Sequence, residues 1–470
     1  MSELKRTAAA PPVRHVHLGL GNFFRAHQAW YSHRAPDAAQ WGIAAFTGRS
    51  PELATALAAQ DGLFTLVTRA ADGDRFEVVD SLTRAHPADD HDAWLGYFAD
   101  PRVQVVTTTV TEAGYLRGSD GGLDADRPEV RADVAALRGD LRAPVRTAPA
   151  RLVAGFAARR RAGAGPLTVV PCDNLPENGS VIARVLGELA ELVDPGLARW
   201  VTGNVAYVTT MVDRITPEPT ADDVAAVEAA TGVRDRAPVV TEPFTEWVLC
   251  GEFAAGRPRW EDAGATFTAD VAPFEERKLW LLNGAHSLLA YAASIRGHIT
   301  VADAMGDETC RGWLEEWWEA ASAHLTLPAA DVVAYRAALI DRFANPRMRH
   351  RLDQIAADGS QKLPIRILPT LRRERAAGRL PLGATRALAA WVCHLRGRGA
   401  AVTDARAAEL ASLAQGPLPD AVRGVLEALD PELAADDAVV QAVLAQATEL
   451  LSTPAPERVR PSAVLGARSI

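Results

Sequence analysis

The chain has 470 residues and a formal net charge of −9, with 50 lysines and arginines against 59 aspartates and glutamates. Hydrophobic residues make up 48% and charged residues 23% of the sequence, which is typical of a globular protein and excludes disorder or a collagen-like repeat. A chain of this length is expected to form two or three domains. Its acidic balance argues against nucleic acid or an anionic membrane as the main partner.

The sequence predicts an intracellular protein. No apolar run approaches the roughly 18 residues that cross a bilayer. Residues 1–12 are polar and rich in alanine and proline, without the apolar core of a signal peptide, and predict a flexible N-terminal tail. The four cysteines lie far apart without a CxxC pair, which excludes a disulfide framework and fits a reducing cytoplasm. No cluster of histidine, cysteine and aspartate has the spacing of a zinc site, so no metal is expected.

The N-terminal half alternates between short strands and helices. An apolar run over residues 15–21 ends in glycines, and a helical pattern follows over 25–32. Further strands are expected at 41–47, 64–68, 76–79, 103–111, 167–171 and 205–212, with helices at 51–59, 91–98, 150–162 and 180–193. This alternation predicts a mostly parallel, doubly wound sheet with helices on both faces, a Rossmann-type dinucleotide-binding domain over residues 13–260.

The C-terminal half, residues 261–470, changes to helical periodicity. Helices are expected at 275–295, 308–324, 330–343, 384–395, 404–414 and 435–451, with prolines such as Pro364 and Pro381 as breakers between them. The expected fold class is therefore an α/β Rossmann-type N-terminal domain plus an all-α C-terminal domain, which would carry substrate-binding and catalytic groups.

The first glycine turn has part of the pattern of a dinucleotide-binding site. Gly19 and Gly21 take the first two glycine positions, and Phe24 takes the third. Gly19 would allow a tight turn and Gly21 would let a pyrophosphate approach the backbone, while Arg25 would add a charged contact to that phosphate. Because the turn follows a strand and precedes a helix, we favour dinucleotide binding over a plain glycine turn.

The end of the second predicted strand leaves the choice of cofactor open. An acidic residue about 20 residues after the turn would hold the ribose hydroxyls of NAD. The first carboxylate in this region, Glu52, comes slightly late, whereas Arg49 and Ser50 would suit the 2′-phosphate of NADP. The expected cofactor is NAD, with NADP as the alternative.

A helical stretch at the start of the C-terminal half carries four polar residues on one arc. At about 100° per residue, they fall at about 0°, 60°, 80° and 140° around the axis, in the order Lys278, Glu275, His286 and Asn283. Desolvation lowers the pKa of a lysine and makes it a usable base, while an asparagine amide can donate to a developing oxyanion. The alternative is a buried structural network, or simply the solvent-facing stripe of a helix. Gly284 weakens a helix by about 1 kcal/mol, which indicates the close approach of another group and favours a functional site.

Two loops after predicted strands are expected to supply further site residues. Residues 172–179 contain Asn174, and residues 211–217 contain Asp213. Active-site groups collect at the carboxyl ends of the strands in a doubly wound sheet. Each loop also has a structural interpretation, either an asparagine cap for the next helix or a local ion pair between Asp213 and Arg214.

Taken together, these residues resemble the mannitol dehydrogenase family of polyol-specific long-chain dehydrogenases/reductases, which includes fructuronate and tagaturonate reductases. The matching segments follow the family order over about residues 13–450, and they are 19–29, 109–115, 172–179, 211–217, 278–286 and 359–364. The resemblance implies a Rossmann-type domain and a helical C-terminal domain. It also implies metal-independent, nicotinamide-dependent interconversion of a secondary alcohol and a ketose or keto-acid, of the mannitol/fructose or mannonate/fructuronate type.

The resemblance also implies roles for individual residues. Lys278 looks like the general base, with Asn174 and Asn283 as an oxyanion pair. His286 then orients the substrate, and Glu275 is the proton-relay carboxylate. The candidate substrate-binding residues are Asp213, Lys362 and Arg366, of which the last two could anchor a uronate carboxylate or hydrogen-bond polyol hydroxyls. The candidate cofactor contacts are Gly19, Gly21, Phe23, Arg25, Arg49, Thr111 and Glu112.

Two other functions stay open at this point. A dehydrogenase for a phosphorylated polyol would need clustered basic side chains, and the candidates are Arg347, Arg349, Arg351 and Arg366. Such a run of charges is more often a solvated face. A non-catalytic nucleotide-sensing module would be expected to lack the base, but Lys278 is present. The expected partner is a small polyol, ketose or uronate, and the chain is expected to act as a monomer or weak homo-oligomer.

Overall fold

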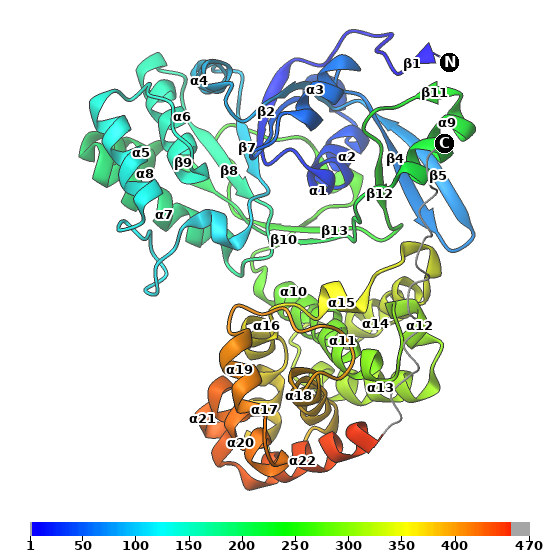
Figure 1. Ribbon diagram of the computed structural model, residues 1–470. Coiled ribbons are helices and arrows are strands. Elements are labelled where there is room, and N and C mark those ends of the chain that lie inside the picture. The colour runs from blue at the N-terminus through cyan, green and yellow to red at the C-terminus, as the bar shows by residue number, and fades with distance from the viewer. Residues whose placement is uncertain (1, 453–470) are drawn as a thin grey trace, which may run out of the picture. The chain divides into compact units, whose positions relative to one another are not determined.

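The computed structural model describes residues 2–452 and divides the chain into two compact units, Met1–Glu275 and Glu276–Ile470 (Figure 1). Each unit has its own architecture. The first is an α/β unit and the second is helical, which confirms the fold class predicted from the sequence. Within the described residues, no helix combines the length and the apolar character needed to cross a membrane.

A six-stranded parallel sheet forms the centre of the first unit. In spatial order its strands are β6 (Leu82–His86), β3 (Gly42–Phe46), β2 (Val13–Leu18), β7 (Val105–Thr108), β8 (Leu167–Pro171) and β9 (Val205–Tyr207). Counted from β2, this is the 3-2-1-4-5-6 order of a dinucleotide-binding sheet. The order reverses between β2 and β7, so the loops that follow these two strands meet at the switch point where such sheets bind their ligands.

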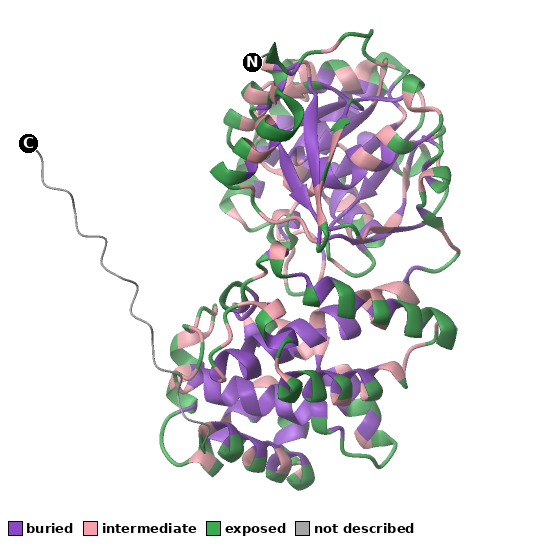
Figure 2. Cartoon of the chain, turned by 90° about the vertical axis from the view of Figure 1, so that its right-hand side faces the viewer, coloured by how far each residue is buried: buried purple, intermediate pink, exposed green. Residues whose placement is uncertain are grey.

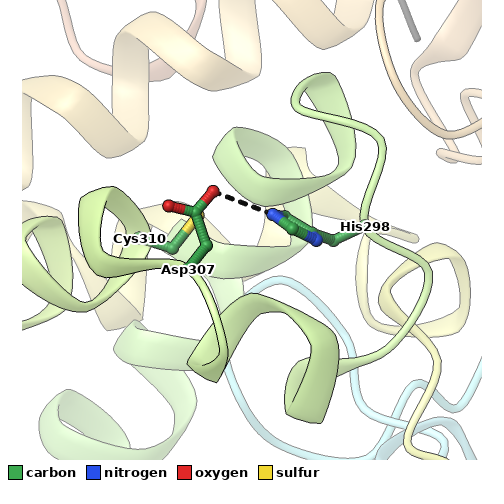
Figure 3. Close-up of side chains that lie close together, drawn as sticks. All are labelled: His298, Asp307 and Cys310. Carbon is green, nitrogen blue, oxygen red and sulfur yellow. Dashed lines mark hydrogen bonds and ion pairs between the residues drawn. The ribbon is translucent and has the colours of Figure 1, made fainter.

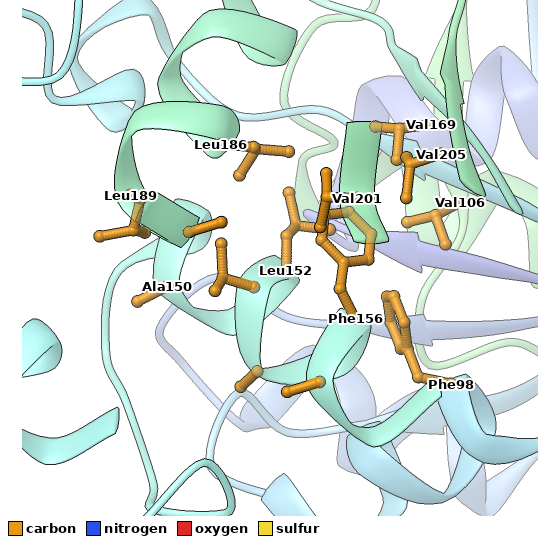
Figure 4. Packing of buried hydrophobic residues seen from close by; sticks show 14 of the residues in the cluster. Phe98, Val106, Ala150, Leu152, Phe156, Val169, Leu186, Leu189, Val201 and Val205 are labelled. Carbon is orange, nitrogen blue, oxygen red and sulfur yellow. The ribbon is translucent and has the colours of Figure 1, made fainter. Parts of the chain in front are cut away.

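Both faces of this sheet are buried, because successive residues of each strand point to opposite faces. Val106 and Val169 pack against helices on one face, while Val105 and Val170 pack in the layer on the other. The helices of the first face are α4 (His91–Ala99), α6 (Ala148–Ala162), α7 (Asn178–Val193) and α8 (Pro195–Asn204) (Figure 4). Burial on both faces explains the nearly continuous apolar sequence of the central strands (Figure 2).

Smaller sheets account for the strands that lie outside the parallel sheet. They comprise β10 (Thr209–Asp213) with β13 (Glu246–Cys250) and β14 (Thr266–Phe267), and β12 (Val239–Thr241) with β4 (Phe64–Ala70) and β5 (Gly73–Val79). The single strand predicted at 205–212 is therefore wrong, because β9 and β10 belong to different sheets. The apolar run continues through Val208, so the pattern of hydrophobic residues does not reveal the break.

The first residues differ from the flexible tail expected for 1–12. Strand β1 (Ser2–Glu3) pairs in parallel with β11 (Val233–Arg234). The Arg6 guanidinium donates to the Asp61 carbonyl at 2.9 Å and to the Leu82 carbonyl at 2.6 Å. These partners lie far away in the sequence, so local composition cannot predict them.

The second unit contains helices in place of strands. Its buried centre is formed by α11 (Ala285–Ile295), α13 (Glu308–Ser322) and α18 (Leu382–Leu395), against which α22 (Asp437–Ser452) packs (Figure 1). The other helices are α12 (Val301–Met305), α14 (Ala329–Ala344), α15 (Leu352–Ile355), α16 (Gly359–Arg366), α17 (Leu368–Ala376), α19 (Ala407–Leu413), α20 (Leu418–Leu429) and α21 (Pro431–Ala435). Pro364, predicted as a breaker, lies inside α16, near the end of this short helix.

The helix predicted over 275–295 is divided into three parts. Helix α10 (Ala272–Arg277) is followed by a π-helix, η4 (Lys278–Gly284), and then by α11. A π-helix bonds each residue to the fifth one along rather than the fourth. The angle predicted between Lys278 and Asn283 for an unbroken α-helix is therefore wrong, because a π-helix lies between them.

Candidate active site

The glycine turn after β2 fits the pyrophosphate of a dinucleotide. The φ angle of Gly19 is +115°, and a Cβ there would lie 2.5 Å from the carbonyl oxygen of Thr109, so only glycine is accommodated. At Gly21 the backbone is extended, and a Cβ would meet nothing nearer than the Gly19 carbonyl oxygen at 3.5 Å. The turn is thus tightly packed at Gly19, whereas space remains beside the backbone of Gly21. A phosphate that approaches the backbone requires such space.

Buried polar groups next to the glycine turn hold its backbone by hydrogen bonds. The Thr109 hydroxyl donates to the Gly19 carbonyl at 2.8 Å, and His17 Nε2 lies 3.1 Å from the same hydroxyl oxygen. Burial lowers the pKa of His17 well below its usual value, so this ring is neutral. Its imidazole stacks on Phe24 at 3.6 Å between centroids. This packing explains why Phe24 replaces the third glycine of the pattern.

Arg25 differs from the phosphate contact expected of it. The side chain is buried, and its donors already bond the carbonyl oxygens of Gly21 and Ala237 and the side-chain oxygen of Asn22. The guanidinium therefore ties the glycine turn to the segment before β12. We leave Arg25 out of the proposed cofactor contacts and regard it as a structural anchor of the turn.

The other expected cofactor contacts follow strands of the parallel sheet. Arg49 is exposed after β3, and Thr111 and Glu112 are exposed after β7, at the start of the short helix η2 (Glu112–Tyr115). Phe23 is half-buried and stacks on His27 with 5.0 Å between ring centroids. Their place at the carboxyl ends of β2, β3 and β7 suits a dinucleotide, and their roles stay predictions.

Asn174 lies in the loop after β8, on a backbone fixed by its neighbour Asp173. The Asn174 side chain is exposed, whereas Asp173 is buried. One carboxylate oxygen of Asp173 accepts the Leu175 amide hydrogen at 2.9 Å, and the other accepts the hydroxyl hydrogen of Tyr115. Because Tyr115 follows β7, this pair joins the loop expected to hold cofactor to the loop that carries Asn174. The pair was not predicted from the sequence, although both residues lie in segments that match the family.

Burial raises the pKa of Asp173 to about 6, although its hydrogen bonds oppose the shift. The folded state therefore holds this proton more tightly than the unfolded state does. The stabilising contribution is fully present below the usual pKa of 3.8 and is lost as the pH rises through about 6. The loss amounts to about 3 kcal/mol at most.

We expect Asp173→Asn to remove this pH-dependent loss. The free energy of unfolding of the variant minus that of the wild type should increase by up to about 3 kcal/mol as the pH rises from about 4 to 7, because only the wild type loses stability over this range. Chemical denaturation at a series of pH values measures this difference. A difference that stays constant across the range would contradict the assigned titration.

The start of α7 is fixed by a second buried residue, Asn178. Its amide nitrogen donates to the Thr210 carbonyl, and its oxygen accepts from the Thr210 amide, both at 2.9 Å. A Cβ at Gly179 would lie 2.5 Å from the Thr209 hydroxyl oxygen, so helix and strand approach closely. The N-cap residue of α7 is Glu177, whose side chain forms no capping hydrogen bond, so no asparagine stands at the N-cap position. The Glu177 amide donates at 3.3 Å to the carboxylate of Glu275, the predicted proton relay.

Asp213 ends β10 as a buried carboxylate. It lies opposite Glu246 in the antiparallel pair of β10 and β13. The neighbouring Arg214 bonds the carbonyl oxygens of Ala26 and Glu242 and stacks over Trp30 at 4.8 Å. The Arg214 guanidinium is thus bonded to backbone carbonyls, and the part of Asp213 in substrate binding stays a prediction.

In the second unit, three predicted catalytic residues lie on one continuous helical stretch. Lys278 and Asn283 are half-buried near the two ends of η4, and His286 is buried in the first turn of α11. The His286 ring stacks on Phe343 at 4.7 Å and meets His350 edge-on at 4.8 Å.

His286 is neutral, because burial lowers its pKa well below the usual value and nearby cations lower it further. Its Nε2 atom is buried and has no hydrogen-bond partner among residues 2–452. Buried polar atoms are rarely left without a partner. This nitrogen therefore suits a substrate hydroxyl.

Of the two basic residues expected to bind substrate, Arg366 and Lys362 of α16, the first contacts the helical stretch of η4 and α11. The Arg366 guanidinium donates to the Asn283 carbonyl at 3.4 Å and to the Ser287 hydroxyl at 3.3 Å. The Lys362 ammonium donates to the Ile355 carbonyl at 3.3 Å. Of the arginines considered for a phosphorylated substrate, Arg351 forms an ion pair at 2.6 Å with its neighbour Asp353.

One group of possible metal ligands was not expected from the sequence, which shows no cluster with the spacing of a zinc site. His298, Asp307 and Cys310 come together at the start of α13 (Figure 3). Asp307 also accepts from Arg296 at 2.6 Å, and burial raises the pKa of the Cys310 thiol to about 12. A metal site needs deprotonated ligands. A neighbouring guanidinium and a protonated thiol are unsuited to a cation, so this cluster is a structural link between α11 and α13.

A cavity of about 900 Å³ in the first unit lies away from the predicted residues. It is lined by residues of β13, β14 and the segment between them, including Phe253, Arg257 and Phe267. Arg257 lies over the Phe267 ring at 3.8 Å and pairs with Glu261. No predicted site residue lines this cavity, so we do not assign the cofactor to it.

The sheet order, the glycine turn at the switch point and the polar groups after β7 and β8 define a dinucleotide-binding dehydrogenase with a separate helical unit. Residues 13–262 match the mannitol dehydrogenase Rossmann domain, and residues 270–451 match the mannitol dehydrogenase C-terminal domain. The chain therefore belongs to the mannitol dehydrogenase family. The family, the fold class and the kind of enzyme predicted from the sequence, a nicotinamide-dependent secondary-alcohol dehydrogenase, are confirmed.

Several relatives resemble the chain over most of its length. It is 38% identical over 460 residues to D-arabinitol 4-dehydrogenase of Ralstonia nicotianae, covering 94% of this chain and 97% of that protein. It is 38% identical over 369 residues to D-mannonate oxidoreductase of Escherichia coli, covering 76% and 75%. The solved ternary complex of Pseudomonas fluorescens mannitol 2-dehydrogenase with NAD and D-mannitol is 31% identical, with a TM-score of 0.81 and coverage of 96% and 94%.

Proposed function

We propose that the protein interconverts a sugar alcohol or an aldonate and the matching ketose or keto-acid, with NAD as cofactor and Lys278 as the base. The observation that carries this proposal is the match over nearly the whole chain to a dehydrogenase solved with NAD and D-mannitol. The glycine turn supports it, because Gly19 and Gly21 fit a pyrophosphate. The unpartnered Nε2 of His286 supports a hydroxylated substrate.

Each proposed catalytic residue has a separate role in alcohol oxidation. When bound, NAD supplies the acceptor for the hydride, which no protein side chain provides. Lys278, in its neutral form, takes the proton of the reacting hydroxyl. Asn174 and Asn283 donate amide hydrogen bonds to the oxygen as negative charge develops on it. Neutral His286 orients a neighbouring hydroxyl, and Glu275 passes the proton from Lys278 toward solvent. Ketone reduction uses the same groups in reverse, with Lys278 charged.

A substrate panel tests the proposed activity. The protein is supplied with mannitol, sorbitol, arabinitol, mannonate or altronate and with NAD or NADP, and reduced nicotinamide is followed by its absorbance. We expect turnover of at least one of these alcohols. Arg366 and Lys362 would favour the two aldonates if they bind a carboxylate rather than hydroxyls. Tight NAD binding without turnover of any of them would instead favour a nucleotide-sensing module.

The choice between NAD and NADP depends on the loop after β3. We expect a higher kcat/KM with NAD, and the measurement is a comparison of kcat/KM for the two cofactors with one substrate. A preference for NADP would contradict this expectation and would point to the exposed Arg49 as the residue that reads the 2′-phosphate. Arg49→Ala should then reduce that preference.

No metal should be needed, because Lys278 and the two asparagines fill the roles that a catalytic zinc would take. We expect full activity after incubation with EDTA and removal of the chelator. The variant Asp307→Asn serves as a control, since it alters the one cluster with possible metal ligands among the described residues. Its response to EDTA should be the same as that of the wild type. Activity that disappears in EDTA and returns with zinc would overturn the assignment.

A further inference from the structure

The π-helix η4 decides how two proposed catalytic residues lie relative to each other. Lys278 and Asn283 are five residues apart at the two ends of this segment. In an α-helix, five residues turn by about 500°, which leaves the two side chains about 140° apart around the axis. In a π-helix the backbone bonds residues that are five apart, so such residues lie one turn above each other on one side. The π-helical form thus brings Lys278 and Asn283 to the same side of the helix.

Two consecutive tryptophans of α13 bind the middle of this π-helix. Trp317 Nε1 donates to the carbonyl oxygen of Trp280 at 2.9 Å, and Trp318 Nε1 donates to that of Leu281 at 2.8 Å. Both indoles are fully buried, so these bonds are not exchanged for bonds to water. Side chains that insert into the backbone hydrogen-bond ladder are a known cause of departures from α-helical geometry.

Close packing holds both the ring and the backbone of Trp317. A Cβ at Gly284 would lie 2.5 Å from Cζ2 of this ring, which confirms the close approach expected from a glycine inside the helix. On the far side, a Cβ at Gly383 of α18 would lie 2.5 Å from the backbone nitrogen and Cα of Trp317. Helix α13 is therefore held between two glycines, and its indole is fixed against η4.

Arg373 of α17 also contacts side chains in and just before the π-helix. The guanidinium of Arg373 lies over the Trp280 ring at 4.5 Å and forms an ion pair at 3.0 Å with Glu276. Arg373 contacts side chains, whereas Trp317 and Trp318 bond backbone carbonyls. Because the α-helix and the π-helix differ in their backbone hydrogen bonds, we assign the choice between them to the two tryptophans.

We propose that Trp317 and Trp318 are positioning residues for the reaction. By bonding two carbonyls of η4, they hold the segment in the π-helical form that aligns the base Lys278 with the oxyanion donor Asn283. The inference rests on the proposed function, which assigns those two roles. Without the indole donors the segment relaxes toward an α-helix, and Asn283 turns away from the oxygen that loses its proton to Lys278.

The variants Trp317→Phe and Trp318→Phe test this, because each keeps an aromatic ring and removes the N–H donor. We expect kcat to fall by about 10-fold to 100-fold, as misplacement of about 1 Å can cause. The dissociation constant of NADH, measured by its fluorescence, should stay unchanged. Trp313→Phe is the matched control on the same helix, since Trp313 packs under Arg296 and Arg386 and has no hydrogen bond to η4. Its kcat should remain near that of the wild type.

A double-mutant cycle separates positioning from a loss of folding. Asn283→Ala should lower kcat strongly in the wild type but only slightly in Trp317→Phe, where the amide has already moved. Additive losses would overturn the inference. So would a crystal structure of either tryptophan variant in which residues 278–284 keep the π-helical hydrogen bonds. If Lys278→Ala and Asn283→Ala in the wild type leave kcat unchanged, the proposed function fails instead, and the crystal structures still decide what the tryptophans hold in place.

Discussion

Replacing Lys278 with alanine is expected to lower kcat for alcohol oxidation by about 10²-fold to 10⁴-fold, the usual contribution of a general base. NADH binding should be unaffected, because the expected cofactor contacts lie after β2, β3 and β7 in the first unit. The remaining activity should lose the pH dependence that the neutral amine imposes. Steady-state kinetics over a pH series and a fluorescence titration with NADH measure both effects.

Two controls make this result specific to the base. Lys5→Ala removes an exposed lysine that pairs with Asp61 in the first unit, and it should leave kcat and its pH profile unchanged. Glu275→Gln should slow turnover and shift the profile without abolishing the reaction, since it removes only the proposed proton route. Near-normal turnover in Lys278→Ala with an unaltered profile would exclude Lys278 as the base.

Removal of either asparagine of the oxyanion pair should have the second largest effect. Asn174→Ala and Asn283→Ala are each expected to lower kcat by about 10²-fold to 10³-fold, the loss seen when one oxyanion donor is removed. Such donors act mainly in the transition state, so KM for the alcohol and the dissociation constant of NADH should change little.

The structure offers a control for the loop that carries Asn174. Tyr115→Phe removes the hydroxyl that bonds Asp173 but leaves the Asn174 amide in place. This variant should lower kcat less than Asn174→Ala does. A loss in Asn174→Ala confined to cofactor affinity would count against its role as an oxyanion donor.

Periodic features of the sequence were sufficient to predict a mostly parallel sheet with helices on its faces in the first unit, but not the smaller sheets beside it. Apolar runs such as those of β7 and β8 are buried on both faces, and such runs separated by helices specify a parallel sheet. The glycine turn was predictable because Gly19 needs a backbone conformation that other residues avoid. The π-helix was not, because its cause lies in the indoles of Trp317 and Trp318, 37 residues away from the carbonyls they bond.

Single side chains with distant partners also escaped prediction. Arg25 follows the glycine turn as a phosphate ligand would, yet its donors bond Ala237, which is 212 residues away in the sequence. Asp173 and Tyr115 are 58 residues apart and show no pattern that links them. In both cases burial in the folded unit, rather than local sequence, determines what the charged or polar group contacts.

The most direct test of Lys278 as the base is the pH dependence of kcat/KM in both directions for one alcohol and ketone pair. Oxidation should rise and reduction should fall with increasing pH, around one apparent pKa of the free enzyme. Burial lowers the pKa of His286 well below its usual value and that of His350 to about 4, so neither histidine can produce a change above pH 6. The variant Asp173→Asn excludes a contribution from that carboxyl. Opposite slopes that disappear in Lys278→Ala are the predicted result, and slopes of the same sign, or slopes that persist in the variant, would contradict the assignment.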